Sequence, residues 1–293
     1  MNPWIEAMRL RTLPVSLAGV ILGIALGRHA GGTDYLQGVL CLLFALLAQI
    51  ASNFGNEYFD FRAGLDKKGR EGFRRGVTEG DISPRAMLAA TLGTLGVACL
   101  VGIVMVLLSG VWWLIPAGIV IALFALAYSA GPWPLSHHGL GDIAVIIFFG
   151  LVPVCLTAFL CCGARWEEPE MIVPASIAVG LMASNVLIVN NYRDADDDRE
   201  VGKHTTAVIF GRGTMRTVYL LSGFAAMALL WPVWCATVSL FSPAVPLLYL
   251  FLHLILWRRL GTRKGSALNP LLGLTAMNLL LCSLLTSLLL VAA

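Results

Sequence analysis

The sequence has few charged residues. Asp, Glu, Lys and Arg make up only 13% of its 293 residues, against roughly 25% in a typical soluble domain. So little charge cannot cover the surface of a soluble protein of this size. Apolar residues reach 58% and the mean hydropathy is +0.82, which excludes a disordered chain. The composition therefore predicts a membrane protein with several spans.

The common motifs of soluble enzymes are also missing. The sequence has no GxxxxGK[ST] phosphate loop, no HExxH, no GxSxG and no GxGxxG. None of the seven cysteines forms a Cys-x-x-Cys pair, so neither a disulfide framework nor a zinc site is expected. Basic residues interleaved with aromatics, which are typical of nucleic-acid binding, are absent. No obligatory protein partner is indicated.

Long apolar stretches fill most of the chain. A helix needs about 20 apolar residues to cross a bilayer, and we expect nine spans. They lie at roughly 12–28, 36–58, 85–109, 111–130, 141–163, 171–192, 214–240, 243–258 and 267–292. The sequence therefore predicts an all-α fold, a polytopic bundle of nine membrane-spanning helices that forms a single domain over 1–293.

The distribution of Lys and Arg predicts the orientation of these spans. If the N-terminus is cytoplasmic, 18 of the 20 Lys and Arg residues lie on the cytoplasmic face, and only Arg28 and Arg165 lie on the other. Such a bias is the positive-inside signal of membrane proteins. We therefore expect an integral protein of the cytoplasmic membrane, and the net charge of +3 reflects orientation rather than nucleic-acid binding.

The acidic residues are clustered. Eleven of the 17 fall in two segments that follow the second and sixth predicted spans, both on the predicted cytoplasmic face. Asn56 and Asp60 are four residues apart and share a helix face, and so do Asn190, Asp194 and Asp198. Carboxylate and amide oxygens of this kind suit Mg²⁺, which often shares its ligands with a phosphate. The neighbouring Lys and Arg suit a diphosphate.

The two motifs repeat at a constant distance, since Asn56 to Asn190 and Asp60 to Asp194 both span 134 residues. The repeat suggests two related halves. A solvated charged loop would explain either motif alone, and a membrane carrier could use the acids as a cation gate. A carrier is, however, expected to have ionisable residues near mid-membrane, and no predicted span carries Asp, Glu, Lys or Arg away from its ends.

Five stretches resemble the UbiA superfamily of membrane prenyltransferases, and the resemblance extends over nearly the whole chain. They are 4–14, 56–66, 74–84, 127–142 and 190–205. The last is most similar to the branch that prenylates 1,4-dihydroxy-2-naphthoate in menaquinone biosynthesis. The resemblance implies a central cavity open to the cytoplasm and to lipid. It also implies Mg²⁺-dependent transfer of a polyprenyl group from its diphosphate to the naphthoate, with loss of CO₂; 4-hydroxybenzoate and homogentisate are alternative acceptors.

The resemblance also implies roles for individual residues. The expected metal ligands are Asn56, Asp60, Asp194 and Asp198. The expected diphosphate-binding residues are Arg11, Arg75 and Lys203. The residues expected beside the prenyl cation and the aromatic acid are Tyr128, Ser129 and Asp142. Tyr128 would act by cation–π contact, and Asp142 has the alternative role of a helix cap at the start of the fifth span.

Three further residues stand close to these motifs. Glu57 occupies a position where the family commonly has Asp, and its side chain is one methylene longer, so we leave it out of the metal ligands. His137 and His138 lie between the fourth and fifth predicted spans. We expect them to anchor the loop or face the substrate rather than bind zinc, because no further ligands are near in the sequence.

Overall fold

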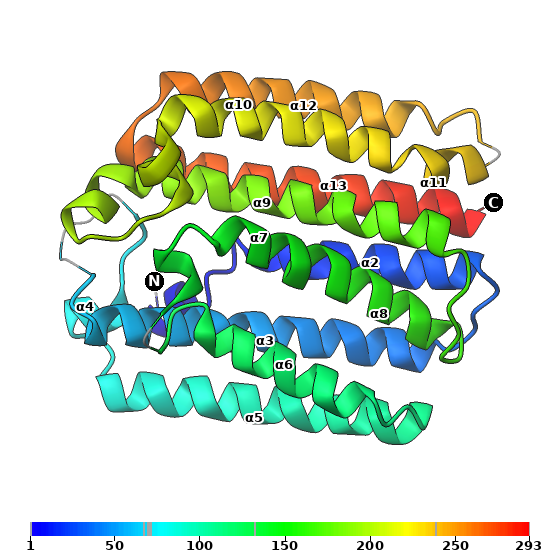
Figure 1. Ribbon diagram of the computed structural model, residues 1–293, viewed down its shortest axis with the longest axis horizontal. Helices are drawn as coiled ribbons and strands as arrows, with labels where there is room; N and C mark the ends of the chain where they lie inside the picture. The colour runs from blue at the N-terminus through cyan, green and yellow to red at the C-terminus, as the bar shows by residue number, and fades with distance from the viewer. Residues whose placement is uncertain (1, 67, 69–71, 132, 238, 293) are drawn as a thin grey trace.

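The computed structural model describes residues 2–66, 68, 72–131, 133–237 and 239–292. Residues 67, 69–71 and 132, which belong to the acidic and motif segments, lie outside the described part. The helices run side by side as one bundle (Figure 1). They are α1 (Pro3–Ala7), α2 (Leu13–His29), α3 (Tyr35–Arg62), α4 (Gly76–Glu79), α5 (Pro84–Ser109), α6 (Leu114–Ala127), η1 (Leu135–His137), α7 (Gly141–Val145), η2 (Ile146–Leu151), α8 (Val152–Cys161), α9 (Pro169–Glu200), α10 (Thr206–Leu229), α11 (Trp231–Ala236), α12 (Ala244–Thr262), η3 (Gly265–Leu268) and α13 (Asn269–Ala292).

The membrane-spanning helices fall on the predicted spans. In the described residues, seven helical segments are long and apolar enough to cross a membrane, and the two shorter apolar helices are α2 and α6. The prediction of an all-helical membrane bundle is therefore confirmed, and the count of nine depends on those two short helices. The seventh span, predicted at 214–240, differs in the structure: α10 is broken at Gly211, whose φ of 80° and ψ of 157° are not helical, and α11 follows with Pro232 in its first turn.

Local sequence signals set the helix ends. At the start of α5 the Ser83 side chain accepts a hydrogen bond from the backbone N–H of Ala86 at 3.2 Å, and Pro84 occupies the first helical turn. The same helix ends at Gly110, whose φ of 68° is left-handed and favours glycine. These are standard helix start and stop signals.

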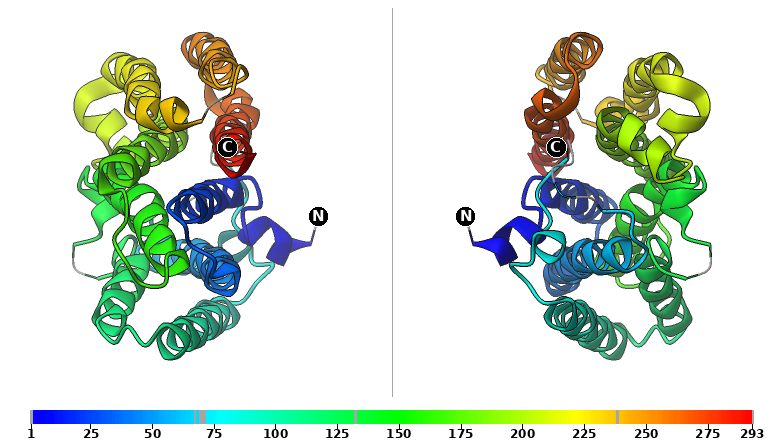
Figure 2. Two further views of the ribbon diagram at one scale, coloured as in Figure 1. Left: turned by 90° about the vertical axis from the view of Figure 1, so that its right-hand side faces the viewer. Right: turned by 90° about the vertical axis from the view of Figure 1, so that its left-hand side faces the viewer.

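The bundle is built around α2, which lies near its middle in the end-on views (Figure 2). Helices α10 and α12 lie on one side of it, and α5 and α6 lie on the other. Helix α2 packs very closely on α8, since a Cβ at Gly23 would lie 2.8 Å from the Val154 carbonyl oxygen and one at Gly27 only 2.9 Å from that of Ala158. Small residues permit such contacts between membrane helices.

The fifth span contains a π-helical segment, η2, between α7 and α8. Pro153 follows it and lacks the N–H that would continue the α-helical ladder. Gly150 in this segment meets α9 backbone to backbone, because a Cβ there would lie 2.5 Å from the Gly180 Cα. The π turn contributes Phe148 and Phe149 to the wall of the central cavity.

A cavity of about 720 Å³ lies inside the bundle. Residues of α2, α3, α5, α6, the α7–η2–α8 segment and α9 line it. Asp60 and Asp194 lie at its polar end, near α4, and Leu114 and Leu160 line it toward the opposite end of the bundle. The central cavity expected from the resemblance is therefore present, and it is apolar for most of its length.

Candidate active site

The two acidic motifs meet at the polar end of the cavity. Helices α3 and α9 extend a turn or more beyond their predicted spans, to Arg62 and Glu200, so the motif residues stand on helical backbone. All four predicted metal ligands line the same cavity: Asn56, Asp60, Asp194 and Asp198. The four-residue spacing places the residues of each motif on one helix face, and the fold brings both faces to one cavity.

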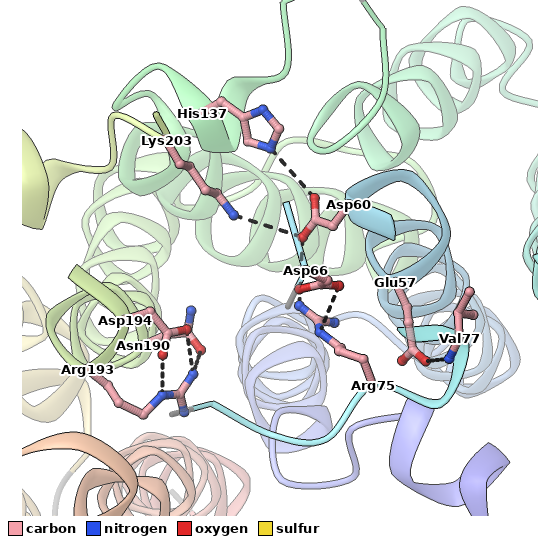
Figure 3. Close-up of polar contacts among 10 residues, drawn as sticks. All are labelled: Glu57, Asp60, Asp66, Arg75, Val77, His137, Asn190, Arg193, Asp194 and Lys203. Carbon is pink, nitrogen blue, oxygen red and sulfur yellow. Dashed lines mark hydrogen bonds and ion pairs between the residues drawn. The ribbon is translucent and has the colours of Figure 1, made fainter. Parts of the chain in front are cut away.

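Asp60 is the centre of a cluster of cationic side chains (Figure 3). Its Oδ2 atom lies 3.7 Å from Nη2 of Arg75 and 3.9 Å from Nζ of Lys203, and its Oδ1 atom lies 3.6 Å from Nε2 of His137. Asp60 is 3% exposed, so the Arg75 and Lys203 cations balance a charge that water cannot reach. Three loops therefore converge on the end of α3.

Arg75 lines the cavity from the loop that leads into α4. Its Nε atom lies 3.5 Å from Oδ2 of Asp66, a motif residue outside our predicted site. Among the described residues, Nη1 of Arg75 has no hydrogen-bond partner although it is buried. A buried guanidinium with a spare donor is suited to bind an anion in the cavity.

Arg193 makes the densest contacts of the second motif (Figure 3). Its guanidinium donates to both carboxylate oxygens of Asp194, at 2.6 and 2.8 Å. It also donates to Oδ1 of Asn190 and Oδ1 of Asn269, each at 2.8 Å. This residue belongs to the 190–205 motif, but no role for it was predicted from the sequence. Its position directly before Asp194, inside a predicted helix, was the available signal.

The chain after α9 folds back toward the cavity. The hydroxyl of Thr205 donates to Oδ2 of Asp198 at 3.3 Å, and the backbone N–H of Lys203 donates to the Asp198 carbonyl at 2.8 Å. The turn includes Gly202 with a left-handed φ of 74°. It places the Lys203 side chain at the cavity wall beside Asp60.

The predicted acceptor residues are only partly at the cavity wall. Tyr128 and Asp142 line it, whereas Ser129 is buried and does not. The oxygens of Asp142 accept hydrogen bonds from the hydroxyls of Ser184, at 3.1 Å, and Thr206, at 2.7 Å, so this side chain joins α7 to α9 and α10.

Arg11 lies outside the cavity wall. It is exposed, and its guanidinium lies over the Phe73 ring, 4.9 Å from the ring centre. Arg9 lines the cavity instead, from a left-handed backbone conformation with φ of 52°. The Asn53 side chain donates a hydrogen bond to the carbonyl of Met8, the residue before Arg9, at 2.9 Å. This bond ties the N-terminal segment to α3. In the N-terminal segment, Arg9 rather than the predicted Arg11 therefore lines the cavity.

Glu57 and His138 both point to backbone groups. The Glu57 side chain accepts a hydrogen bond from the backbone N–H of Val77 and does not line the cavity. Nδ1 of His138 lies 2.9 Å from the Pro134 carbonyl, and its ring stacks on Trp133. These contacts anchor loops at the polar end.

The donor set fits a magnesium ion that is shared with a ligand. Within the described residues, no three His, Cys, Asp or Glu side chains converge closely enough to hold a metal by themselves. Oδ1 of Asp60 is buried and accepts no hydrogen bond among them, with the His137 ring at 3.6 Å, so this oxygen keeps the capacity to bind a cation. Mg²⁺ prefers oxygen ligands and commonly takes one or two carboxylates together with substrate phosphates. The carboxylates of α3 and α9 at the same cavity match this preference of Mg²⁺.

Known structures share this fold. A UbiA homologue from Archaeoglobus fulgidus, solved bound to GPP and Mg²⁺, matches with a TM-score of 0.66 over 99% of this chain and 100% of that chain, at 16% identity. A UbiA homologue from Aeropyrum pernix matches with a TM-score of 0.71 over 92% of this chain and 94% of that one, also at 16% identity. At this identity the likeness concerns the fold alone.

Sequence relatives are closer. The chain is 37% identical to a 1,4-dihydroxy-2-naphthoate octaprenyltransferase from Haemophilus influenzae, over 98% of this chain and 95% of that protein. It is 38% identical to the Escherichia coli protein of the same name, over 77% of this chain and 75% of that protein. The family model of the UbiA prenyltransferase family matches residues 15–291. The chain is thus an integral membrane protein that belongs to the UbiA prenyltransferase family.

Proposed function

We propose that this protein transfers a polyprenyl group from its diphosphate to 1,4-dihydroxy-2-naphthoate, with release of diphosphate and CO₂. The observation that carries the proposal is the convergence of two Asn-x3-Asp motifs at the polar end of one apolar cavity. The acceptor is taken from the relatives, which are named 1,4-dihydroxy-2-naphthoate octaprenyltransferases.

The polar end of the cavity suits a diphosphate because it combines cations with oxygen ligands. Arg75, Lys203 and Arg9 add positive charge from three separate loops, and we assign to Arg9 the role expected for Arg11. When bound, Mg²⁺ would neutralise negative charge on the leaving diphosphate. The residues that would hold the ion are Asn56, Asp60, Asp194 and Asp198.

The proposed reaction breaks and forms one bond at the allylic carbon. The C–O bond to diphosphate breaks, and the diphosphate leaves with the electron pair. The electron-rich naphthoate ring supplies a pair to form the new C–C bond. The ring carboxylate then leaves as CO₂, and its bonding electrons stay in the ring. The arginine and lysine side chains stabilise the developing charge of the diphosphate because they are fixed before the reaction begins.

The apolar part of the cavity suits the prenyl chain. Phe124 and Phe148 face each other with ring centres 4.8 Å apart, and both line the cavity. Such walls exclude water, which would otherwise trap a carbocation. Tyr128 also lines the cavity, where its ring can stabilise the allylic cation by its π face and its hydroxyl can donate to the acid.

We also propose that the site faces the cytoplasm, since 18 of the 20 Lys and Arg residues lie on that side of the predicted topology. The polar end of the cavity is then the entry for the aromatic acid, and the bilayer is the source of the prenyl diphosphate. Residues 1–293 form one UbiA-type membrane domain in this proposal.

Competition between two aromatic acids tests the assignment of the acceptor. Purified protein receives Mg²⁺, a polyprenyl diphosphate, and dihydroxynaphthoate together with 4-hydroxybenzoate. Four extra buried ring carbons, at about 0.8 kcal/mol each, favour the naphthoate by roughly a hundredfold. A preference for the one-ring acid would contradict the naphthoate assignment and leave the family membership standing.

A further inference from the structure

Glu57 belongs to the first acidic motif but faces away from the cavity (Figure 3). It is 1% exposed, and it is absent from the cavity wall that Asn56 and Asp60 line. Neighbouring residues of a helix point about 100° apart, so Glu57 turns from the chamber toward the loop that leads into α4. A buried carboxylate on this face needs hydrogen-bond donors.

The donor is a backbone N–H group of α4. Oε1 of Glu57 accepts from the N–H of Val77 at 3.0 Å. This amide lies in a single helical turn, where N–H groups have no partner within the helix. Space is tight here, because a Cβ at Gly76 would lie 3.3 Å from Oε1. Glu57 therefore fixes the backbone of α4 from another helix.

Arg75 directly precedes Gly76 and Val77. Its side chain is 10% exposed and lies 3.7 Å from Asp60, and it lines the diphosphate end of the cavity. The Val77 amide is two residues from the Arg75 backbone, so a displacement of this turn displaces the guanidinium. The position of a charge in a binding site matters steeply, since small misplacements of binding groups reduce rates strongly.

We infer that Glu57 is a positioning residue, which places the Arg75 guanidinium for the diphosphate by holding the N–H group of Val77. This inference rests on the proposed function, because it assigns Arg75 to the prenyl diphosphate. It also gives a reason for glutamate at this position. An aspartate, shorter by one methylene, would not reach Val77 from the same backbone.

Two substitutions separate positioning from metal binding. Glu57→Gln keeps an acceptor oxygen at the same reach and removes the charge, whereas Glu57→Asp keeps the charge and loses the reach. We expect Glu57→Asp to raise KM for octaprenyl diphosphate about tenfold, as the loss of one buried hydrogen bond would, with a smaller change in kcat. Glu57→Gln should lie closer to the wild type. The reverse order, with a higher Mg²⁺ requirement in Glu57→Gln, would overturn the inference.

The same substitution made in the Arg75→Lys variant tests whether Glu57 acts through Arg75. If Glu57 acts through that residue, Glu57→Asp should add little to the KM increase of Arg75→Lys, because coupled residues are not additive. Full additivity overturns the inference. Glu79→Asp, the same change on α4 away from the cavity wall, is the matched control. Thermal unfolding in detergent identifies any variant that fails to fold, and the Gln variant then carries the test.

The controls separate this inference from the proposed function. A wild-type protein that turns over no octaprenyl diphosphate with dihydroxynaphthoate refutes the proposed function. An active wild type whose Glu57→Asp variant has an unchanged KM refutes only the positioning role.

Discussion

Replacing Arg193 with alanine would break a buried ion pair at the polar end of the cavity. The side chains of Arg193 and Asp194 are each only 2% exposed, and two hydrogen bonds of 2.6 and 2.8 Å join them. The variant would leave the Asp194 carboxylate without its bidentate partner. It would also remove the link to Asn269 at the start of α13.

The magnitude follows from burial. Removing one partner of a buried pair costs about 3–5 kcal/mol, because the remaining charge stays away from water. Arg212 and Asp196 form the matched control, since their side chains are 37% and 68% exposed on the same end of the bundle. An exposed pair of this kind contributes only about 0–1 kcal/mol.

Thermal unfolding of the detergent-solubilised variants measures the difference. With an unfolding entropy of about 2.1 cal/mol/K per residue, Arg193→Ala should lower Tm by roughly 5–8 °C and Arg212→Ala by less than about 2 °C. Prenyl transfer should also fall in Arg193→Ala, because Asp194 loses its orientation. Equal Tm values for the two variants would show that burial does not increase the contribution of the Arg193–Asp194 pair to stability.

Three further predictions follow from the site and the packing. Asp60→Asn should remove most prenyl transfer at saturating Mg²⁺ while the protein remains folded by thermal unfolding; near wild-type turnover would contradict the two-motif site. In a background without native cysteines, Ala63→Cys and Glu200→Cys, both at exposed positions, should react with an impermeant thiol reagent only from the cytoplasmic side. Gly150→Ala should lower Tm by several degrees because its Cβ would press on the α9 backbone, whereas Gly96→Ala, with nothing within 4 Å, should not.

The sequence was sufficient to predict the parts of the site that depend on local periodicity. Asn56 and Asp60 lie one helical turn apart on α3, and the second motif has the same spacing on α9, so each pair shares a face whatever the rest of the fold does. Their meeting in one chamber could be expected from topology, because four predicted spans separate the motifs and return the chain to the same membrane face.

Contacts that depend on loop conformation could not be predicted in this way. The chain adopts a left-handed conformation at Arg9, and no periodicity indicates that this residue rather than Arg11 lines the cavity. Ser129 follows Tyr128 directly, yet the chain leaves α6 there and the hydroxyl is buried away from the wall. Glu57 shares a motif with metal-ligand candidates, and only the fold of residues 74–80 reveals the backbone group that it holds.

Release of CO₂ from carboxyl-labelled dihydroxynaphthoate shows whether this protein couples prenyl transfer to decarboxylation of the acid. Purified protein is incubated with the labelled acid, a polyprenyl diphosphate and Mg²⁺, and CO₂, diphosphate and prenylated product are counted in the same reaction. We expect the three to appear in equal amounts, to require both Mg²⁺ and the prenyl diphosphate, and to be nearly lost in Asp194→Asn. CO₂ release without the prenyl diphosphate, or diphosphate release that yields no prenylated naphthoquinol, would contradict the proposed reaction.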